Sequence, residues 1–521
     1  MRHHTGILVL TISLLLATGA AATRGIPAIS KVDSRGGARL QMSLSAPQGA
    51  GALVLTGFRG RESMSTLFSF EIDLQATDPA AIPFEAVLGK EWGVTVTLRG
   101  NPPRHFNGIC SRFTQRDPDP AGNRRYRAEI VPRLWLLTRK QSSRIFQELS
   151  VPEIVEQVLG DLPGLEFDIR LEGTFHDRNY CVQYRETDFA FISRLMEEEG
   201  IFYYFEQTAG AHKLVVANVP EAHPDLPGVF PYTQKAFSPG HLGSIQSCEK
   251  TQEIRSGSYT LRDYDFELPN DDLEVRATIQ ESVVAGQVLH RLGAGGGDAF
   301  EIYDYPGEYA ERFDGIDRGR VERPEELRKI PEDGLRTVGI RMQEEAAGSL
   351  VVRGASSAPA FVPGHKFQLT QHFNGDGKYV ITAVRHEVQA PVGRGGGEYR
   401  NQFECIPEGL PFRPARTTPK PIISGTQTAV VVGPAGVEIY TDKYGRVKVQ
   451  FHWDREGARD ESSSCWIRIA ALNAGTEFGA IHIPRLGTEV VVSFLEGDPD
   501  RPIITGSVYN SEHLPPGSAG R

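Results

Sequence analysis

The chain has 521 residues, of which 40% are hydrophobic and 23% are charged, so it can bury a core and is not globally disordered. Its formal net charge of −10 argues against a general binder of nucleic acids or anionic membranes. The 55 glycines and 34 prolines follow no collagen-like period and indicate many turns, and hence many strands. The five cysteines are far apart and form no C-x-x-C pair, which predicts isolated buried thiols rather than a zinc site or a disulfide scaffold.

Residues 1–22 resemble a secretory signal. Arg2 precedes an aliphatic run over residues 7–16, and three alanines at 20–22 fit a cleavage site. The run is too short for a transmembrane helix, and no other segment of the sequence approaches a membrane span. A second interpretation is that translation starts at Met42, so that residues 1–41 are a misassigned leader outside the functional protein.

From residue 53 to residue 205 the pattern predicts strands and two helices. Alternating or β-rich segments indicate strands at 53–58, 68–74, 94–98 and 201–205. Ser150 is a candidate N-cap for a helix that ends at Gly160. Apolar residues at helical spacing predict a second helix from Asp188 to Glu199, which Gly200 terminates.

Strands return after residue 349. They are expected at 350–352, 367–370 and 379–384, with a hairpin turn at 374–377 between the last two. A Pro-rich stretch then indicates a linker over 413–432, which separates a first unit, 42–412, from a compact unit, 433–510. The tail, 511–521, is polar and is expected to be unstructured.

Five or six short strands in residues 433–510 predict a small barrel of the five-stranded oligomer-binding (OB) type. Val447, Val449 and Phe451 alternate with polar residues, so we expect these three side chains on the buried face. The polar side chains between and after them are expected on the outer face, and they are Lys448, Gln450 and His452.

The sequence contains no G-x-S-x-G elbow, no H-E-x-x-H pair and no complete phosphate loop. His365, His372 and His386 lie on neighbouring expected strands, so a metal site is conceivable. Three partly exposed strand histidines are the simpler interpretation.

Two further groups could in principle carry chemistry. Glu197, Glu198 and Glu199 end the second predicted helix, where a solvated face is the expected structure. His452 and Asp454 lie close together in the barrel, with no nucleophile nearby in the sequence. We therefore expect no catalytic residue, no bound metal and no cofactor.

Four segments carry long and specific motifs. They are YCVQYRETD through RLMEEEGI at 180–201, YPGEY at 305–309, IYTDKYGRVKVQFHWD at 439–454 and FLEGDPDRPIITG at 494–506. These motifs resemble those of the VgrG family, the spike proteins of the type VI secretion system. The resemblance covers about residues 53–514.

The resemblance implies a mainly β, α+β fold. Phage tail-hub-like β-barrel domains with a few helices would occupy residues 42–412, and an OB-fold spike barrel would occupy 433–510. It also implies a homotrimer that caps the Hcp tube ring and is propelled into target cells with effectors, so the role is mechanical and not enzymatic. Such a protein is cytoplasmic during assembly and secreted through the apparatus, with no nucleic acid partner and no stable membrane anchor.

The sequence departs from the family pattern at both ends. Members usually continue into a β-helical needle with a PAAR-repeat tip, whereas this sequence ends at Arg521, so we expect the needle to be absent. That favours either a truncated, non-functional remnant or a short spike that depends on another chain for trimerisation and PAAR binding. Family spikes also leave without a cleaved signal, which favours Met42 as the start.

Three other functions remain open on the sequence. One is a phage-derived tail hub and spike, the same machine in another setting. The others are a cell-wall hydrolase, for which only residues 510–521 follow the barrel, and a periplasmic glycan- or nucleic-acid-binding barrel, which the leader favours. The barrel sequence has no basic stripe interleaved with aromatics of the kind that nucleic-acid binding needs.

Overall fold

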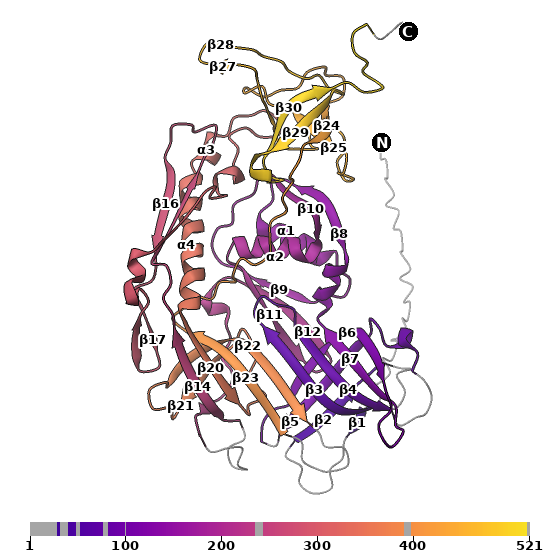
Figure 1. Ribbon diagram of the computed structural model, residues 1–521, viewed down its shortest axis with the longest axis vertical. Coiled ribbons are helices and arrows are strands. Elements are labelled where there is room, and N and C mark those ends of the chain that lie inside the picture. The colour runs from indigo at the N-terminus through magenta and orange to yellow at the C-terminus, as the bar shows by residue number, and fades with distance from the viewer. Residues whose placement is uncertain are drawn as a thin grey trace, which may run out of the picture.

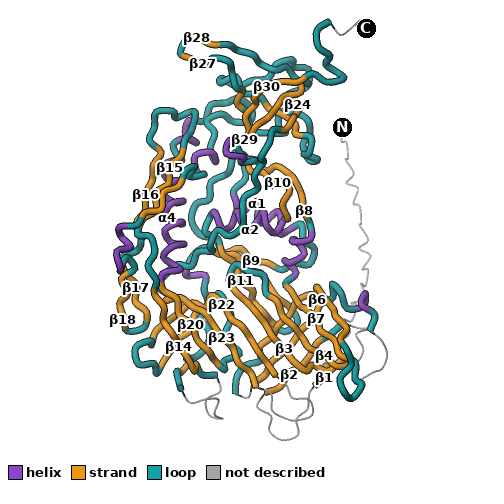
Figure 2. Tube along the Cα trace, in the orientation of Figure 1, coloured by secondary structure: helices purple, strands orange, loops and turns teal. Residues whose placement is uncertain are grey.

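The computed structural model describes residues 29–31, 40–47, 53–76, 82–98, 100–234, 243–389 and 398–517. The expected signal segment, 1–22, lies outside these residues. The chain is mainly β, as predicted, and Figure 1 shows three tiers along its long axis. A large sheet lies at one end, helices and short sheets lie in the middle, and a small barrel lies at the other end. Figure 2 shows that the longer helices gather in the middle tier.

The large sheet has 13 strands and is built from both the first and the last parts of the hub sequence. Its main path runs β1-β2-β5-β6-β7-β4-β3-β22-β23-β20-β14, with β21 and β13 branching from β22. Its strands are β1 (Ile29–Lys31), β2 (Leu40–Ser45), β3 (Leu53–Ser63), β4 (Ser69–Ala76), β5 (Glu91–Leu98), β6 (Arg104–Arg116), β7 (Arg125–Val131), β13 (Phe230–Pro231), β14 (Ile245–Gln252), β20 (Leu350–Ser356), β21 (Lys366–Thr370), β22 (Gly377–Gln389) and β23 (Glu398–Pro407).

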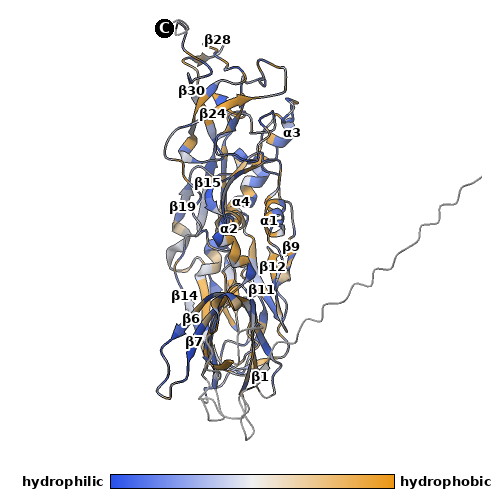
Figure 3. Ribbon diagram, turned by 90° about the vertical axis from the view of Figure 1, so that its right-hand side faces the viewer, coloured by the Kyte–Doolittle hydropathy of each residue, from blue (hydrophilic) through white to orange (hydrophobic). Residues whose placement is uncertain are grey.

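Period-two patterning builds this sheet. On β4 every second side chain is buried, so Phe70, Ile72 and Leu74 enter the core while the residues between them do not. Met42 is also buried, on β2, a strand that begins two residues earlier at Leu40. Figure 3 shows that the β6–β7 hairpin becomes hydrophilic where it extends beyond the sheet.

The middle tier holds the two predicted helices and the strands around them. Ser150 and Glu153 form the capping box of α1, and Gly200, with φ of +66°, follows α2 in the left-handed conformation that favours glycine. The elements are β8 (Gln141–Phe146), α1 (Val151–Gly160), β9 (Phe167–Arg170), β10 (Cys181–Thr187), α2 (Asp188–Glu198), β11 (Phe202–Thr208) and β12 (Ala211–Ala217).

The other half of this tier contains a helix that the sequence pattern did not predict. Helix α4 has 20 residues but no clear apolar stripe, and its sequence contains Gly334 and two other glycines. Gly334 is required by packing, because a Cβ there would lie 2.9 Å from the Tyr309 ring. The elements are β15 (Ser258–Asp263), β16 (Leu273–Thr278), β17 (Ser282–Ala285), β18 (Val288–Arg291), β19 (Glu301–Asp304), α3 (Pro324–Leu327) and α4 (Ile330–Ser349).

The small barrel has the five-stranded sheet that was expected, in the order β25-β24-β29-β30-β26, and a bridge between Val447 and Ile467 links its outer strands. Its first strand begins at Gln427, inside the segment expected to be linker, because residues 427–432 pair with both β25 and β29. The five strands are β24 (Gln427–Val432), β25 (Lys448–Phe451), β26 (Arg468–Ile469), β29 (Glu489–Phe494) and β30 (Pro502–Val508). A separate two-stranded hairpin is formed by β27 (Ala474–Gly475) and β28 (Phe478–Gly479).

The expected buried face of β25 is confirmed, and His452, which follows the strand, is exposed as expected. The outer face of the strand itself is not exposed. Val449 and Phe451 are in the core, yet Lys448 and Gln450 are buried as well. The Lys448 ammonium lies over the Trp466 ring, 4.8 Å from its centroid, and Gln450 donates to the Asp454 backbone oxygen. Neighbouring loops therefore cover the side of the strand that alternation assigned to solvent.

Short 3₁₀ helices connect these elements: η1 (Phe84–Ala86), η2 (Arg133–Arg139), η3 (Pro220–Ala222), η4 (Ala294–Ala299), η5 (Ala310–Arg312) and η6 (Leu495–Gly497). The cysteines are free thiols, four of them buried and Cys248 half-buried. In the described ranges, no helix combines the length and the apolar character that crossing a membrane requires.

Candidate functional site

The three strand histidines do not share a site. His386 is fully buried in a hydrogen-bonded chain, with Nε2 2.9 Å from a Glu62 oxygen and Nδ1 2.7 Å from the Tyr399 hydroxyl. His365 packs against the Tyr204 ring, and His372 accepts a backbone hydrogen bond in the turn that follows it. Among the described residues, the group whose ligand atoms lie close enough together to hold a metal ion consists of Glu311, Asp498 and Asp500.

Residues from three of the four motif segments meet at the junction between hub and barrel, among them Val182, Arg446 and Asp500. The expectation that Glu197, Glu198 and Glu199 form a solvated helix end is wrong. The side chains of Glu198 and Glu199 are only 11% and 4% exposed. Arg178 pairs with both, at 2.8 Å and 2.7 Å. The carboxylates are ionised in the interior because several guanidinium groups surround them.

Glu198 and Glu199, at the end of α2, form ion pairs with arginines from other elements. Burial alone would raise the pKa of Glu198, but Arg178 and Arg194 outweigh it and hold this pKa at about 2. Arginines lower the pKa of Glu199 in the same way, against its burial. One of them is Arg336 of α4, 2.6 Å from Glu199. The network thus connects α2, α4 and the loop before β10.

Residues 413–426, which we call the strap, run from the hub to the barrel without regular secondary structure. The strap is fixed at several points. Glu197 accepts hydrogen bonds from the backbone N–H groups of Thr417 and Thr418, at 3.0 Å and 2.9 Å. Arg413 donates to the carbonyl oxygens of Gly200 and Asn218, at 2.8 Å and 2.6 Å. The first part of the segment expected to be a linker, residues 413–418, is therefore anchored to the hub.

Lys420 of the strap enters a buried cluster that joins all three parts of the junction. Its Nζ lies 2.7 Å from Asp498 and 3.1 Å from Asp500, both in the barrel, and 3.5 Å from Glu311 of the hub. Asp500 also accepts from the backbone N–H of Val182, at 2.6 Å. The Lys420 ammonium thus occupies the centre of the carboxylate group that was the candidate metal cluster.

Acidic side chains outnumber basic ones in this cluster. Three carboxylates face Lys420 and Arg501, whose Nε is 3.2 Å from Glu311. Burial raises the pKa of Glu311 well above its ordinary value, and the neighbouring Asp498 carboxylate raises it further. Burial also raises the pKa of Asp500, whereas the three carboxylates raise that of Lys420 against its burial.

A second buried ion pair crosses from hub to barrel. Two nitrogens of Arg446 donate to the two oxygens of Asp314, at 2.8 Å and 2.9 Å, and its Nε donates to Asp442 at 2.5 Å. The Arg446 guanidinium also lies 5.0 Å from the centroid of the Phe266 ring. Glu267 comes within 3.7 Å of it. Two-pronged pairing of this kind fixes orientation as well as distance.

Apolar and backbone contacts complete the junction. Tyr180 and Val182 of the hub are buried within the same apolar cluster as the barrel core. The Trp466 indole donates to the Asp317 backbone oxygen at 2.8 Å, and Tyr440 donates to that of Arg318 at 3.1 Å. Hub and barrel therefore share a core, buried ion pairs and backbone hydrogen bonds, an arrangement that can transmit force without the barrel pivoting.

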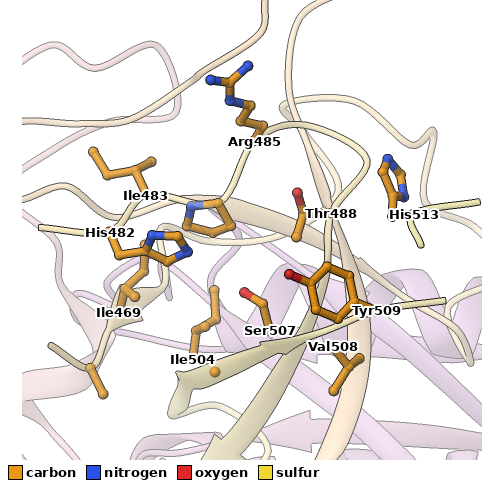
Figure 4. Close-up of a pocket in the computed structure, with 13 residues that line it drawn as sticks. Ile469, His482, Ile483, Arg485, Thr488, Ile504, Ser507, Val508, Tyr509 and His513 are labelled. Atoms are coloured by element: carbon orange, nitrogen blue, oxygen red, sulfur yellow. The ribbon is translucent and has the colours of Figure 1, made fainter. Parts of the chain in front are cut away.

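The barrel has a pocket of about 540 Å³ (Figure 4). Apolar side chains form part of its wall and include Ile469, Ile483, Ile504 and Val508. Polar groups from Arg485, Thr488, Ser507 and two histidines, His482 and His513, also line it. His482 and His513 are exposed, and no carboxylate is among the lining residues.

Sequence reasoning missed Lys420 and Asp314 as residues of the hub–barrel junction. Lys420 lies among prolines in an expected linker, and Asp314 lies in a segment without a strand or helix pattern. Arg446 and Asp500 lie inside recognised motifs, but nothing local to them indicates a partner in the hub. The sequence marked Arg446 and Asp500 only as members of a motif, and no local chemical pattern indicated their role at the junction.

Comparisons with known proteins agree with this architecture. Residues 61–392 match the family described as phage tail baseplate hub (GPD), and residues 429–509 match the type VI secretion system/phage-baseplate injector OB domain. Three type VI secretion system spike proteins of Pseudomonas aeruginosa are similar over 91% of this chain: VgrG1c at 39% identity, VgrG1b at 40% and VgrG1a at 39%. The matches cover 62%, 61% and 70% of those proteins, so the chain spans about 60% of the length of the first two.

Solved structures share the fold. An E. coli protein, c3393, described as a type VI secretion component with structural similarity to the T4 phage tail proteins gp27 and gp5, superposes with a TM-score of 0.60 at 20% identity. That match covers 89% of this chain and 99% of the other. A chain of the half-lidded Francisella PdpA-VgrG complex gives a TM-score of 0.53 at 8% identity, over 90% of this chain and 75% of that one. The chain therefore belongs to the VgrG family of type VI secretion system spike proteins, which joins a phage tail baseplate hub to an injector OB domain.

Proposed function

We propose that this chain is a structural spike subunit that forms a homotrimer, caps the tube of Hcp rings and is driven with its effectors into a target cell. It is assembled in the cytoplasm and leaves through the secretion apparatus. The role is mechanical and not catalytic. A PAAR-repeat tip protein is proposed as a further partner at the barrel end.

The observation that carries this proposal is the hub–barrel junction. A spike that is pushed through an envelope must pass force from its base to its tip, and a flexible linker would let the tip rotate aside. Here the strap is pinned to the hub by Glu197 and to the barrel by Lys420. Arg446 and Asp314 add a buried ion pair between the two parts.

The alternative is a phage-derived tail hub and spike with the same architecture. The relatives at 39–40% identity are all spike proteins of the type VI system, which favours that setting. Hcp release distinguishes a type VI spike from a phage tail hub, because a phage tail hub is not expected to bind an Hcp tube.

The test is complementation in a bacterium that has an active type VI system and whose own spike genes are deleted. We expect the full chain to restore Hcp in the culture medium, and the purified chain to have three times its 57.4 kDa mass by light scattering. The matched control is a Val449→Asp variant, whose barrel core is disrupted. A chain that is expressed and folded but leaves Hcp inside the cells would overturn the proposal.

A further inference from the structure

A cavity of about 140 Å³ lies between the hub and the barrel, and its lining includes the Arg446–Asp314 ion pair. Hub residues from near β10, β15 and η5 line it together with barrel residues from near β26 and η6. Tyr264, which is 48% exposed, and Leu495, which is 40% exposed, are among the lining residues, so the cavity is open to solvent. The space is large enough for several water molecules or for one small ligand.

Two buried polar groups in this lining have no hydrogen-bond partner. Tyr180 is 4% exposed and its hydroxyl makes no hydrogen bond, and the Nη1 atom of Arg501 is also buried without one. The groups that act electrostatically on the Tyr180 hydroxyl include Cys465 and Asp500, which line the same cavity, so the hydroxyl end of this ring lies at the cavity. Burial raises the pKa of Tyr180 well above its ordinary value, so the hydroxyl keeps its proton. Buried donors without acceptors are costly, and both groups are therefore positions for a ligand atom.

The charges of the lining narrow the class of ligand. The acidic side chains share one property, which is that each already accepts from, or is paired with, a nitrogen of the chain. They are Asp265, Glu311, Asp314 and Asp500. These four outnumber the three arginines of the lining, which disfavours a small anion. A small cation is disfavoured as well, because the unpartnered Arg501 nitrogen belongs to a positively charged group. The lining therefore favours a neutral ligand that presents oxygen acceptors.

Aromatic side chains supply much of the remaining wall. They are Tyr180, Tyr264, Phe266, Phe313 and Trp466. A ring with an apolar face can pack against such side chains while its oxygen atoms accept hydrogen bonds from the polar groups beside them. A pyranose sugar has both features, since its C–H groups form an apolar face and its hydroxyls lie around the edge of the ring.

We propose that the hub–barrel cavity binds one neutral pyranose residue, either as a free monosaccharide or as the end residue of a glycan. The Tyr180 hydroxyl and Arg501 Nη1 donate to oxygen atoms of the sugar, and the Tyr264 ring packs against its apolar face. The cavity is built within a single chain and adds sugar binding to the proposed spike function. Its test therefore depends neither on trimer formation nor on Hcp release.

Saturation-transfer NMR on the full chain tests the site directly. The probes are D-glucose, D-galactose, D-mannose and N-acetyl-D-glucosamine, with acetate and methylammonium as charged probes of similar polarity. We expect transfer to at least one sugar, with a dissociation constant on the order of 1–10 mM for so small a ligand. No transfer to any sugar would overturn the proposal, and transfer to acetate or methylammonium alone would overturn the assigned ligand class.

Tyr180→Phe removes the unpartnered hydroxyl and should weaken sugar binding by about three- to tenfold. Its melting temperature should equal or exceed that of the parent chain, because the substitution removes a buried group without a partner. The matched control is Tyr203→Phe, since Tyr203 is 2% exposed and its hydroxyl also lacks a partner, but it does not line the cavity. Equal affinities of the two variants would place the sugar elsewhere and overturn the proposal.

Tyr264→Ala gives an independent measurement at the exposed edge of the cavity. We expect it to weaken sugar binding by about five- to tenfold, because the packing surface for the apolar face of the sugar is lost. Tyr303→Ala is the control, since Tyr303 is 56% exposed and does not line the cavity. Affinities that match this control would contradict the assigned packing surface.

Methyl glycosides of the same sugars distinguish the two sources of the ligand. Their anomeric oxygen is substituted, as it is in a glycan chain. Binding as tight as that of the free sugar, and equally sensitive to Tyr180→Phe, supports the end residue of a glycan. Binding of the free sugar alone supports a monosaccharide.

Discussion

Arg446 of the barrel and Asp314 of the hub, 132 residues apart in the chain, form a two-pronged ion pair in the interior. Their side chains are only 3% and 5% exposed, so the pair is shielded from water and from salt. It lies beside the shared apolar core of the two parts. The pair fixes the orientation of the barrel on the hub within a single chain, without contacts from other copies.

We expect Arg446→Met to destabilise the barrel by about 3–5 kcal/mol, because it leaves Asp314 buried without its partner. Urea unfolding followed by tryptophan fluorescence measures this change, since Trp453 and Trp466 both lie in the barrel. The control is Arg485→Met, whose pairing with Glu438 is exposed and should contribute no more than about 1 kcal/mol. Equal changes in the free energy of unfolding for the two substitutions would show that the buried pair stabilises the barrel no more than the exposed pair does.

Lys420→Met should destabilise the junction more at neutral pH than at pH 5. Without the ammonium, the acidic groups of Glu311, Asp498 and Asp500 lose their shared cation. Protonation of Glu311 and Asp500, whose pKa values burial already raises, limits the repulsion among these groups at lower pH. The difference in melting temperature from the parent chain, measured from pH 5 to pH 8, checks the prediction. Lys443→Met, which removes an exposed pair with Glu322, is the control and should change little at any pH. A Lys420→Met effect that does not depend on pH would contradict the account.

Glu267 should make the stability of the chain fall as pH rises. Burial, reinforced by the Asp314 carboxylate, raises its pKa to about 8 from an ordinary 4.5. Its favourable contribution is complete below pH 4.5, because the unfolded chain loses this proton first, and it is lost as pH rises to about 8. Glu267→Gln stays neutral, so its stability relative to the parent should increase between pH 5 and pH 8.

The measurement is the free energy of unfolding at several pH values, with Glu274→Gln on the exposed strand β16 as the control. A Glu267→Gln difference that is the same at pH 4.5 and pH 8 would show that folding does not raise the pKa of this carboxyl.

Val449→Asp should unfold the barrel, since it places an unpaired charge in a fully buried position, and Phe451→Asp should do the same. The cost exceeds about 4 kcal/mol. Limited proteolysis should then cleave the barrel and leave the hub as a resistant fragment, as seen on a gel. Thr505→Asp on the exposed side of β30 is the matched control and should remain resistant. A Val449→Asp chain as resistant as this control would mean that the core position is misassigned.

Helix α2 and helix α4 show how far sequence patterns reach. Helix α2 was predicted because Phe189, Ile192 and Met196 recur at helical spacing and Gly200 ends the segment. Ile192 and Met196 are buried, and Phe189 is partly buried against the same core. Helix α4 was missed because its buried face includes Asp333 and Arg341, which no apolar pattern reveals. Those residues are buried because other parts of the chain supply their partners, such as Arg312 for Asp333 at 2.7 Å.

The sequence alone determined the mainly β fold, the two capped helices, the buried residues of the barrel core and membership of the family. These follow from local periodicity, caps, turns and contiguous motifs, which are encoded over a few residues at a time. Only the tertiary structure decided that Glu198 and Glu199 are buried, that Lys420 joins hub to barrel and that Lys448 is covered. The energy of a charged side chain depends on partners and solvent exclusion supplied by distant segments, and those exist only once the chain has packed.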